Sequence, residues 1–191
     1  MRYSLPFPYT KILNSVPFIS TQNSSNTTLF SVNSQEIYTK LKEKFGESIF
    51  SFEEVPGDSF IVVAPEAIAD VAQYLAHDEA LSFDSLMCLS GSDLSAKDTT
   101  LEVVYHLFSM THRHKVVLKL IVPKEEPHVP TVENIWKTAE WHERETYDLY
   151  GVVFDGHSDL RRILLPDDWE GHPLRKDYKE PEFYRGMKVP Y

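Results

Sequence analysis

The stretch Thr100–Pro123, TLEVVYHLFSMTHRHKVVLKLIVP, decides the fold class. It contains two runs rich in Val, Leu, Tyr and Phe, Leu101–Met110 and His114–Val122, and this composition is typical of β-strands. Only residues 111–113 separate the two runs, and so short a link returns the chain antiparallel to itself. We therefore predict an antiparallel β-hairpin.

The residues upstream of this hairpin alternate between helical and strand-like patterns. Apolar residues recur at helical spacing over 34–47 and 65–78, with Ser34 as the predicted N-cap and Gly46 as the stop of the first helix. A second hairpin is predicted over 48–64, and one more strand follows downstream of the second helix. Because the strands come in hairpin-linked groups, we predict an α+β fold: a mostly antiparallel sheet with helices on one face, rather than a doubly wound parallel sheet.

The chain divides into four predicted segments. An irregular N-terminal arm (1–33) precedes the α+β domain (34–130), which is followed by a helix (131–151) and an extended, irregular C-terminal tail (152–191). The arm has three prolines and no sustained period, yet it is too apolar for a solvated tail, so we expect it to pack on another surface. The tail has four prolines and 15 charged residues, which predicts that it cannot build a core of its own.

Composition narrows the functional classes. The net charge of −10 argues against nucleic acid as a partner, because phosphate binding needs a basic face. The single cysteine, Cys88, excludes an internal disulfide and a cysteine-ligated cluster within this chain, and it favours a reducing compartment. No apolar run is long enough for a membrane span, and prolines interrupt the N-terminus, so we expect neither a span nor an export signal.

The dense polar residues near the C-terminus permit two functional hypotheses. Carboxylates and a histidine could serve as general acid and base or as metal ligands, which would make the chain a free-standing metal- or carboxylate-dependent enzyme; the candidates are Glu143, Glu145, Asp148, His157, Asp159, Asp167 and Asp168. Interleaved arginines can neutralise these groups, however, and no established metal or catalytic spacing is present. A segment rich in Arg, Trp, Tyr and Pro that cannot fold alone favours a docking surface instead.

A second candidate metal site lies beside the predicted hairpin turn. His106, His112 and His114 straddle this turn and could converge on one ion. Histidines on a strand next to a turn are more often half-exposed polar residues, so we favour the structural interpretation.

The stretch Glu143–Tyr178, ERETYDLYGVVFDGHSDLRRILLPDDWEGHPLRKDY, resembles the signature of the 30 kDa subunit of the proton-pumping NADH-quinone oxidoreductases, respiratory complex I. The resemblance implies a hydrophilic subunit of the peripheral arm, on the cytoplasmic side of the (inner) cell membrane and attached to the membrane only through the complex. It implies no cofactor in this chain, with FMN and iron-sulfur clusters in partner subunits. The implied partners are the D and B subunits, which form the quinone site, together with other peripheral-arm subunits.

The same resemblance suggests which residues form the subunit interface, and it implies no catalytic residue in this chain. Arg144, Arg161, Arg162, Arg175 and Asp177 are predicted to form ion pairs between subunits, while Pro166, Trp169 and Pro173 fix the path of the tail. The full predicted interface set is Glu143, Arg144, Glu145, Asp148, His157, Asp159, Arg161, Arg162, Pro166, Trp169, Pro173, Arg175, Lys176, Asp177 and Tyr178.

Two points qualify the resemblance. Members of the family often have proline where this chain has Ser158, which loosens one turn. Membrane-bound hydrogenases and coenzyme-F420- or ferredoxin-dependent oxidoreductases use a homologous module, and this chain alone does not separate them from complex I.

Overall fold

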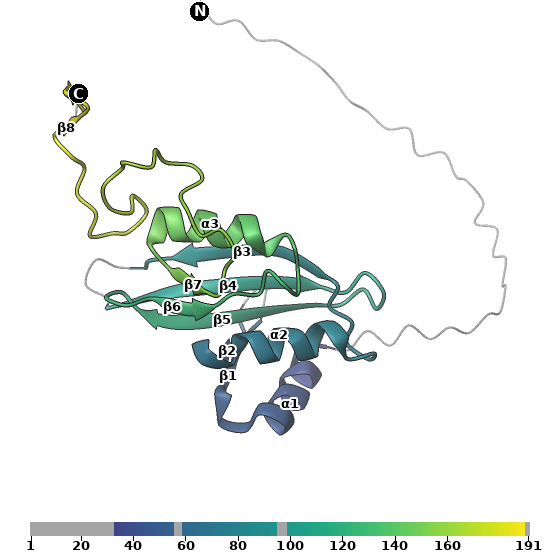
Figure 1. Ribbon diagram of the computed structural model, residues 1–191. Coiled ribbons are helices and arrows are strands. Elements are labelled where there is room, and N and C mark those ends of the chain that lie inside the picture. The colour runs from purple at the N-terminus through teal and green to yellow at the C-terminus, as the bar shows by residue number, and fades with distance from the viewer. Residues whose placement is uncertain (1–32, 56–58, 95–98, 190–191) are drawn as a thin grey trace, which may run out of the picture.

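The computed structural model describes residues 33–55, 59–94 and 99–189 (Figure 1). Its α-helices are α1 (Ser34–Phe45), α2 (Ile68–His77) and α3 (Ala139–Tyr150), with short 3-10 turns η1 (Gly46–Ser48) and η2 (Pro65–Ala67). Its strands are β1 (Ile49–Glu53), β2 (Phe60–Val63), β3 (Ser85–Ser92), β4 (Thr100–Phe108), β5 (Lys115–Pro123), β6 (His128–Pro130), β7 (Val153–Asp155), β8 (Phe183–Tyr184) and β9 (Met187–Lys188).

Five strands form the main sheet, in the order β1-β2-β5-β4-β3. The two predicted hairpins are confirmed: β1 pairs antiparallel with β2, and β4 pairs antiparallel with β5 along its whole length, from Thr100 opposite Pro123 to Phe108 opposite Lys115. The sheet is thus mostly antiparallel, as predicted. One pair, β2 with β5, is parallel, because the long connection through α2, β3 and β4 lets β5 return between two earlier strands.

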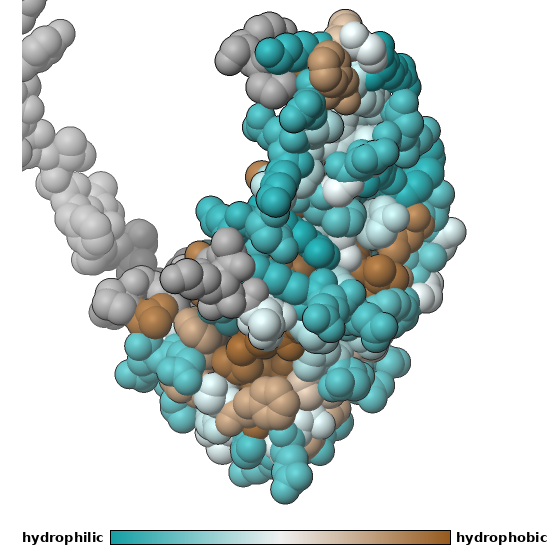
Figure 2. Space-filling model, turned by 90° about the vertical axis from the view of Figure 1, so that its left-hand side faces the viewer, coloured by the Kyte–Doolittle hydropathy of each residue, from teal (hydrophilic) through white to brown (hydrophobic). Residues whose placement is uncertain are grey.

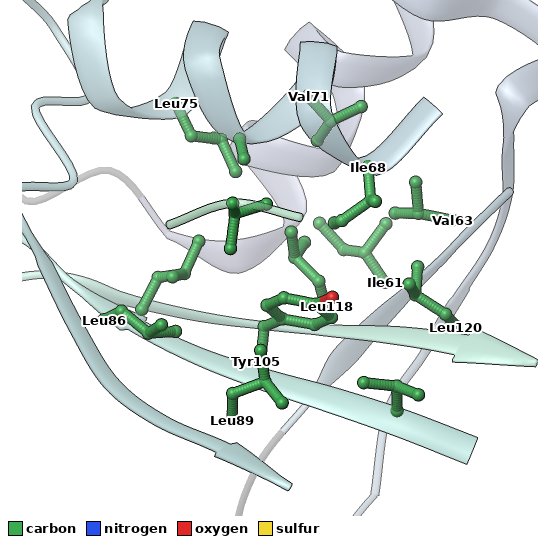
Figure 3. Close-up of a cluster of buried hydrophobic side chains, with 14 of the residues drawn as sticks. Ile61, Val63, Ile68, Val71, Leu75, Leu86, Leu89, Tyr105, Leu118 and Leu120 are labelled. Atoms are coloured by element: carbon green, nitrogen blue, oxygen red, sulfur yellow. The ribbon is translucent and has the colours of Figure 1, made fainter. Parts of the chain in front are cut away.

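Alternating side chains of the sheet form the core. Every second residue of β4, from Leu101 to Leu107, is buried, and the residues between them are half-buried. Figure 3 shows side chains of α2, among them Val71 and Leu75, pointing toward Tyr105 and Leu118 of the sheet. This apolar core holds the sheet and the first two helices together.

The helices cover one face of the sheet, as predicted. In Figure 1, α2, the β6–β7 pair and α3 lie side by side across that face. We name the opposite side of the sheet the open face; it carries Phe60, Val62, Val104, Val117 and Ile121, together with a Glu102–Lys119 ion pair of 3.2 Å. Ile121 is 46% exposed. None of the described helices packs on this face.

Two helix boundaries differ from the prediction. Asn33, not Ser34, caps α1, because its side chain accepts a hydrogen bond of 2.8 Å from the Glu36 N–H. The third helix ends at Gly151 as predicted, but it begins at Ala139 rather than near Thr131. Thr131 instead extends the β6–β7 pairing by donating its N–H to the Asp155 carbonyl at 3.0 Å, and the following residues form a turn whose Trp136 indole donates to the Phe83 carbonyl.

The remainder of the chain adds little regular structure. The predicted tail (152–191) is not irregular from its start, because β7 pairs with β6 and Phe154 is buried in the core. Beyond β7 the tail projects from the domain, with β8 and β9 as its further strands among the described residues (Figure 1). No described helix is long and apolar enough to cross a lipid bilayer. The predicted N-terminal arm, apart from Asn33, lies outside the described residues.

Candidate docking site

Helix α3 buries an unusual set of side chains. Four polar residues, Glu143, Arg144, Thr146 and Asp148, are buried on its inner surface, whereas Trp141 is 59% exposed. Buried charges are costly unless they are paired or hydrogen-bonded. We use the name polar junction for the buried or half-buried charged residues that join α3 to its surroundings: Glu133, Glu143, Arg144, Asp148, His157 and Arg162.

Asp148 is the centre of this junction. Its Oδ2 accepts three backbone N–H bonds, from Ile163 at 3.0 Å, Leu164 at 2.8 Å and Leu165 at 2.9 Å, while its Oδ1 pairs with Arg162 at 2.7 Å. Burial alone would raise the pKa of Asp148, but these donors outweigh burial and hold the pKa below its ordinary value. One carboxylate therefore fixes the path of three consecutive tail residues.

The tail also caps the C-terminal end of α3. The last carbonyls of a helix have no partner within the helix and carry partial negative charge. Here the Asp148 carbonyl accepts from His172 Nδ1 at 3.0 Å, the Leu149 carbonyl from the Leu174 N–H at 3.1 Å, and the Tyr150 carbonyl from Arg175 Nε at 2.6 Å. Residues 172–175 thus replace the solvent that would otherwise satisfy this end of the helix.

Gly151 makes this close approach possible. It has φ +75°, and a Cβ at this position would lie 2.5 Å from the His172 ring and 2.8 Å from the Arg175 guanidinium. Both the backbone conformation and the space exclude a larger residue. The sequence predicted Gly151 as the stop of the helix, but its second role becomes visible only when the tail is in place.

Glu143 lies in a buried cluster that joins three segments. Its oxygens accept from the Thr131 hydroxyl at 2.5 Å and from the Val132 N–H at 2.8 Å, and Oε2 lies 4.0 Å from His157 Nε2. Burial raises the pKa of Glu143 to about 7, although the hydrogen bonds from Thr131 and Val132 and the proximity of His157 oppose this shift. The cluster therefore contains a carboxyl group that titrates near neutral pH.

His157 and Glu133 complete the cluster. His157 Nδ1 accepts from the Asp159 N–H at 3.0 Å, which places the ring proton on Nε2, 3.1 Å from the Glu140 carbonyl. Glu133 accepts from both the N–H and the hydroxyl of Ser158, at 2.9 and 3.1 Å. A proline at position 158 could make neither bond. Ser158 therefore gives this turn two hydrogen bonds that the proline common in the family would not.

Arg144 stabilises the turn that precedes the segment held by Asp148. Its guanidinium donates to the carbonyls of Arg161 and Arg162 at 3.4 and 3.5 Å and lies 4.0 Å from Asp159. Arg162 reaches further along the tail and donates to the carbonyls of Trp169 and Gly171. Both arginines bind backbone atoms of their own chain.

A further anchor, not singled out by the sequence, ties the tail to the sheet. Asp93, just beyond the end of β3, accepts the Lys176 N–H at 2.9 Å and pairs with Lys124 at 2.8 Å. Asp93 lies 83 residues before Lys176, and no local pattern links the two. His172, Glu133 and Thr131 also escaped the sequence analysis as site residues, because each acts through a backbone or long-range contact.

The predicted interface residues separate into three groups by exposure. Glu143, Arg144 and Asp148 are buried within this chain; His157, Arg162, Pro173, Arg175, Trp169 and Tyr178 are half-buried; Glu145, Asp159, Arg161, Pro166, Lys176 and Asp177 are exposed. All of these residues belong to α3 or to the tail, and the contacts of Arg144, Arg162 and Arg175 join the two segments. Their role at a subunit interface stays a prediction.

The distal tail has a small cluster of its own. Trp169 Nε1 donates to the Tyr178 hydroxyl at 3.2 Å, and its ring lies 5.1 Å from that of Tyr184. Asp168 pairs with Arg185 at 2.9 Å. Phe183 and Met187 are exposed by 61% and 64%. In Figure 2 the tail is a largely hydrophilic projection, with isolated hydrophobic side chains, above the more hydrophobic body of the domain.

These contacts also bear on the enzymatic hypothesis. Glu143 and Asp148 direct their oxygens at protein N–H and O–H groups, so these oxygens already have partners. The described residues include no group of three or more His, Cys, Asp or Glu side chains that could hold a metal ion. His112 and His114 bond to the carbonyls of Glu79 and Leu81, but His114 is buried rather than half-exposed as predicted.

The comparisons with known proteins agree on one protein family. The family described as "Respiratory-chain NADH dehydrogenase, 30 Kd subunit" matches residues 61–184. The C subunit of the NADH-quinone oxidoreductase of Chloroherpeton thalassium is 49% identical over 81% of this chain and 64% of its own length. The equivalent proteins of Salinispora tropica and Chlorobium phaeobacteroides, which bear the same name, are 47% and 42% identical, over 76% and 81% of this chain and 61% and 93% of their own lengths. The chain thus spans under two thirds of some of these curated relatives.

Two solved structures share the fold. The trypsin-resistant fragment (1-134) of Nqo5 is 32% identical, with a TM-score of 0.53 over 64% of this chain and 97% of that fragment. A chain of the membrane-bound sulfane sulfur reductase, an archaeal respiratory membrane complex, is 25% identical, with a TM-score of 0.62 over 76% of this chain and 85% of that chain. The match of more than half the chain to one family confirms the resemblance read from Glu143–Tyr178: this protein belongs to the respiratory-chain NADH dehydrogenase 30 kDa subunit family, whose curated bacterial members are named as the C subunit of NADH-quinone oxidoreductase.

Proposed function

We propose that this chain is a non-catalytic docking subunit in the peripheral arm of a proton-translocating NADH-quinone oxidoreductase. It holds the D and B subunits, which form the quinone site, and so supports electron transfer from NADH to quinone. The supporting observation is that the charges of α3 are directed at the backbone of the chain's own tail. The tail is thereby held in a defined path without a core of its own.

The exposed side of the tail fits this role. A partner can reach Leu164, Phe183 and Met187 of the tail and Trp141 of the adjoining helix α3, which are 59–64% exposed. Large apolar and aromatic side chains presented on a polar segment are typical anchors of protein interfaces. The exposed charges of Arg161, Lys176 and Asp177 surround these anchors and can form ion pairs with a partner.

The redox cofactors belong to the partner subunits in this proposal. One cysteine, Cys88, falls short of the four ligands that an iron-sulfur cluster takes. The clusters therefore belong to other chains in this proposal, and FMN is assigned to another chain on the family resemblance alone. The chain is placed on the cytoplasmic side of the membrane, bound to it only through the complex.

The test is assembly in the native host. The double variant Phe183→Ser, Met187→Ser removes two exposed anchors and touches none of the hydrogen bonds that fix the tail on α3. We expect the complex purified in mild detergent to lose this subunit, while the melting temperature of the isolated chain stays unchanged. The matched control, Glu47→Lys, alters an exposed residue of η1, next to β1 at the sheet edge opposite β3, and should leave the complex intact. Normal assembly of the double variant would contradict the docking role of this part of the tail.

A second candidate is the equivalent subunit of a related membrane-bound complex. The structural match to a chain of the sulfane sulfur reductase complex favours it. The same purification distinguishes the two: co-purified flavin-containing, NADH-oxidising subunits support the NADH-quinone oxidoreductase, and a complex that lacks them supports the alternative.

A further inference from the structure

Strand β3 is an edge of the main sheet that lacks the usual protection against pairing with another chain. Native edge strands are commonly short, or they carry charged residues or proline. β3 is eight residues long, and its sequence SLMCLSGS contains neither a charged residue nor proline. β1, the opposite edge, is five residues long and ends in Glu53. A register shift at Met87 interrupts β3, but Cys88–Ser92 beyond it pair continuously with β4. These five residues therefore offer a regular edge to an added strand.

A groove of about 240 Å³ lies along this edge. The strand contributes four consecutive residues, Cys88–Gly91, to its lining. Consecutive residues of a strand point to opposite faces of the sheet, so a groove that touches all four follows the backbone at the outer edge. Within the part of the chain that the structure describes, β4 is the only segment hydrogen-bonded to the backbone of these residues. The groove thus exposes backbone groups that another strand could pair with.

The other wall of the groove is one face of α3, which lies beside β3 in Figure 1. His142, Glu145, Thr146 and Leu149 line the groove, at helical positions that share a face. Leu174 of the tail, which is 47% exposed, lies next to Leu149, because its N–H donates to the Leu149 carbonyl. Glu145 is exposed and forms no ion pair among the described residues. The groove therefore combines an apolar end with one available negative charge.

A single extended segment fits this groove better than a second copy of the chain. A second copy would pair its own β3 antiparallel, about a two-fold axis perpendicular to the sheet, and would bring its α3 to the same side. Paired strands lie about 4.8 Å apart, whereas packed helices need roughly 8–10 Å between their axes. Because α3 already lines the edge of β3, the two helices would collide. The charge of Glu145 favours a basic residue in the added segment.

We propose that an extended segment of a partner subunit adds as a strand to the edge of β3, with apolar side chains against Leu149 and Leu174 and a basic side chain at Glu145. In strand addition, main-chain hydrogen bonds give affinity and the side-chain pockets give specificity. The proposal rests on the proposed docking role of the chain. It adds a second contact, located on the domain rather than on the distal tail.

Hydrogen exchange of the amides of residues 88–92 tests the proposal. It is measured at single-residue resolution by mass spectrometry, on the isolated full-length chain and on the complex purified from the native host in mild detergent. Successive N–H groups of a strand point to alternate sides. The amides that point away from β4 should exchange at least about tenfold more slowly in the complex, because only there do they have a partner strand.

A pair of matched variants connects this protection to the groove. Ser90→Lys places an ammonium in the lining of the groove, and lysine on an edge strand opposes pairing. Ser51→Lys is the control: Ser51 lies on β1, the opposite edge, and both serines are half-buried on the open face, opposite Val62 and Val104. We expect Ser90→Lys to lose the protection or to leave the complex, and Ser51→Lys to behave as the wild type. Circular dichroism of the isolated variants checks that both are folded.

Three results would overturn the proposal alone: equal exchange of these amides in the isolated chain and in the assembled complex, full protection in the Ser90→Lys complex, or protection of the isolated chain that grows with its concentration, which assigns the edge to a second copy. Failure of the docking role is a different result. In that case the wild-type chain does not co-purify with other subunits, and this proposal fails with it.

Discussion

The apolar core beneath α2 and the polar junction beneath α3 are both buried but are stabilised in different ways. In the core, side chains such as Leu75 and Leu118 are held by packing alone. In the junction, Asp148 and Glu143 are fully buried carboxyl groups whose partners are mostly backbone N–H groups. A packed core tolerates substitution of one apolar side chain by another of similar volume. A buried charge, in contrast, destabilises the fold when any one of its partners is removed.

This difference explains why the signature segment needs particular residues at particular positions. A carboxylate that accepts three consecutive N–H groups fixes the backbone of its partner segment as well as its own position. The tail has no apolar core, so these bonds replace one. The junction should therefore be the more fragile of the two regions, and four predictions test this.

Removal of the Asp148 carboxylate should have the largest effect. Asp148→Ala leaves Arg162 and three N–H groups without their acceptor, which should lower the free energy of unfolding by on the order of 3–5 kcal/mol. Urea denaturation measures this loss, and limited proteolysis should show cleavage between 163 and 178. Asp167→Ala, at an exposed position in the same tail, should cost less than about 0.5 kcal/mol. Similar losses for the two variants would contradict a central role for Asp148.

The next largest effect is the pH dependence caused by Glu143. Its pKa is raised from 4.5 to about 7 in the folded chain, so the protonated form stabilises the fold below pH 4.5 and this contribution is lost as the pH rises through about 7. The loss should amount to on the order of 3 kcal/mol. Thermal unfolding from pH 5 to pH 8 should show this decline in the wild type, and Glu143→Gln should abolish it. Asp148, with its lowered pKa, destabilises the fold only as the pH falls below its ordinary value of 3.8. A wild type equally stable at pH 5 and pH 8 would refute the assignment to Glu143.

Gly151→Ala should cost at least about 2 kcal/mol, since it combines an unfavourable backbone conformation with a collision against His172 and Arg175. Gly186→Ala is the matched control, because it has a similar φ of +82° but no atom within 4 Å. The control should show only the backbone cost, of roughly 1 kcal/mol. Chemical denaturation measures the free energy of unfolding of the two variants, and the difference between their losses is the cost of the collision. Equal losses would show that the tail does not lie close to Gly151.

The smallest effect is expected in the apolar core. Leu118→Met keeps the side-chain volume nearly constant and should cost less than about 1.5 kcal/mol by urea denaturation. Its counterpart in the junction, Arg162→Lys, keeps the charge but loses the forked contact with Asp148 and the Trp169 carbonyl, and should cost more. If the core variant proved the costlier of the two, the distinction between the regions would fail.

The parts of the fold that follow local rules were predictable from the sequence. The β-strand composition of Leu101–Met110 predicted β4, and Gly151 predicted the end of α3. The start of α3 was not predictable, because Thr131–Trp136 has helical periodicity but forms bonds to β7 and to Phe83 instead. Local periodicity does not record which distant segment competes for the same backbone groups.

The site was predictable in its residue types but not in its contacts. Arg144, Asp148, Arg162 and Arg175 were found by motif, and the structure shows their partners to be mainly backbone atoms of this chain. Asp93 gave no signal, because its partner lies 83 residues away. Every residue has the same backbone N–H and C=O groups, so residue types do not show which backbone group a side chain will bind. These contacts are visible only in the three-dimensional structure.

The parallel pairing of β2 with β5 has a consequence for the order of folding. Phe60 lies opposite Val117, so the two halves of the sheet join only through residues 57 positions apart. During synthesis, β1 and β2 can form their hairpin but remain without a neighbour on the inner edge until β5 has left the ribosome. Closure of so long a loop is entropically costly and slows folding. The N-terminal half of the domain is therefore the part that most needs protection from aggregation while the chain is still growing.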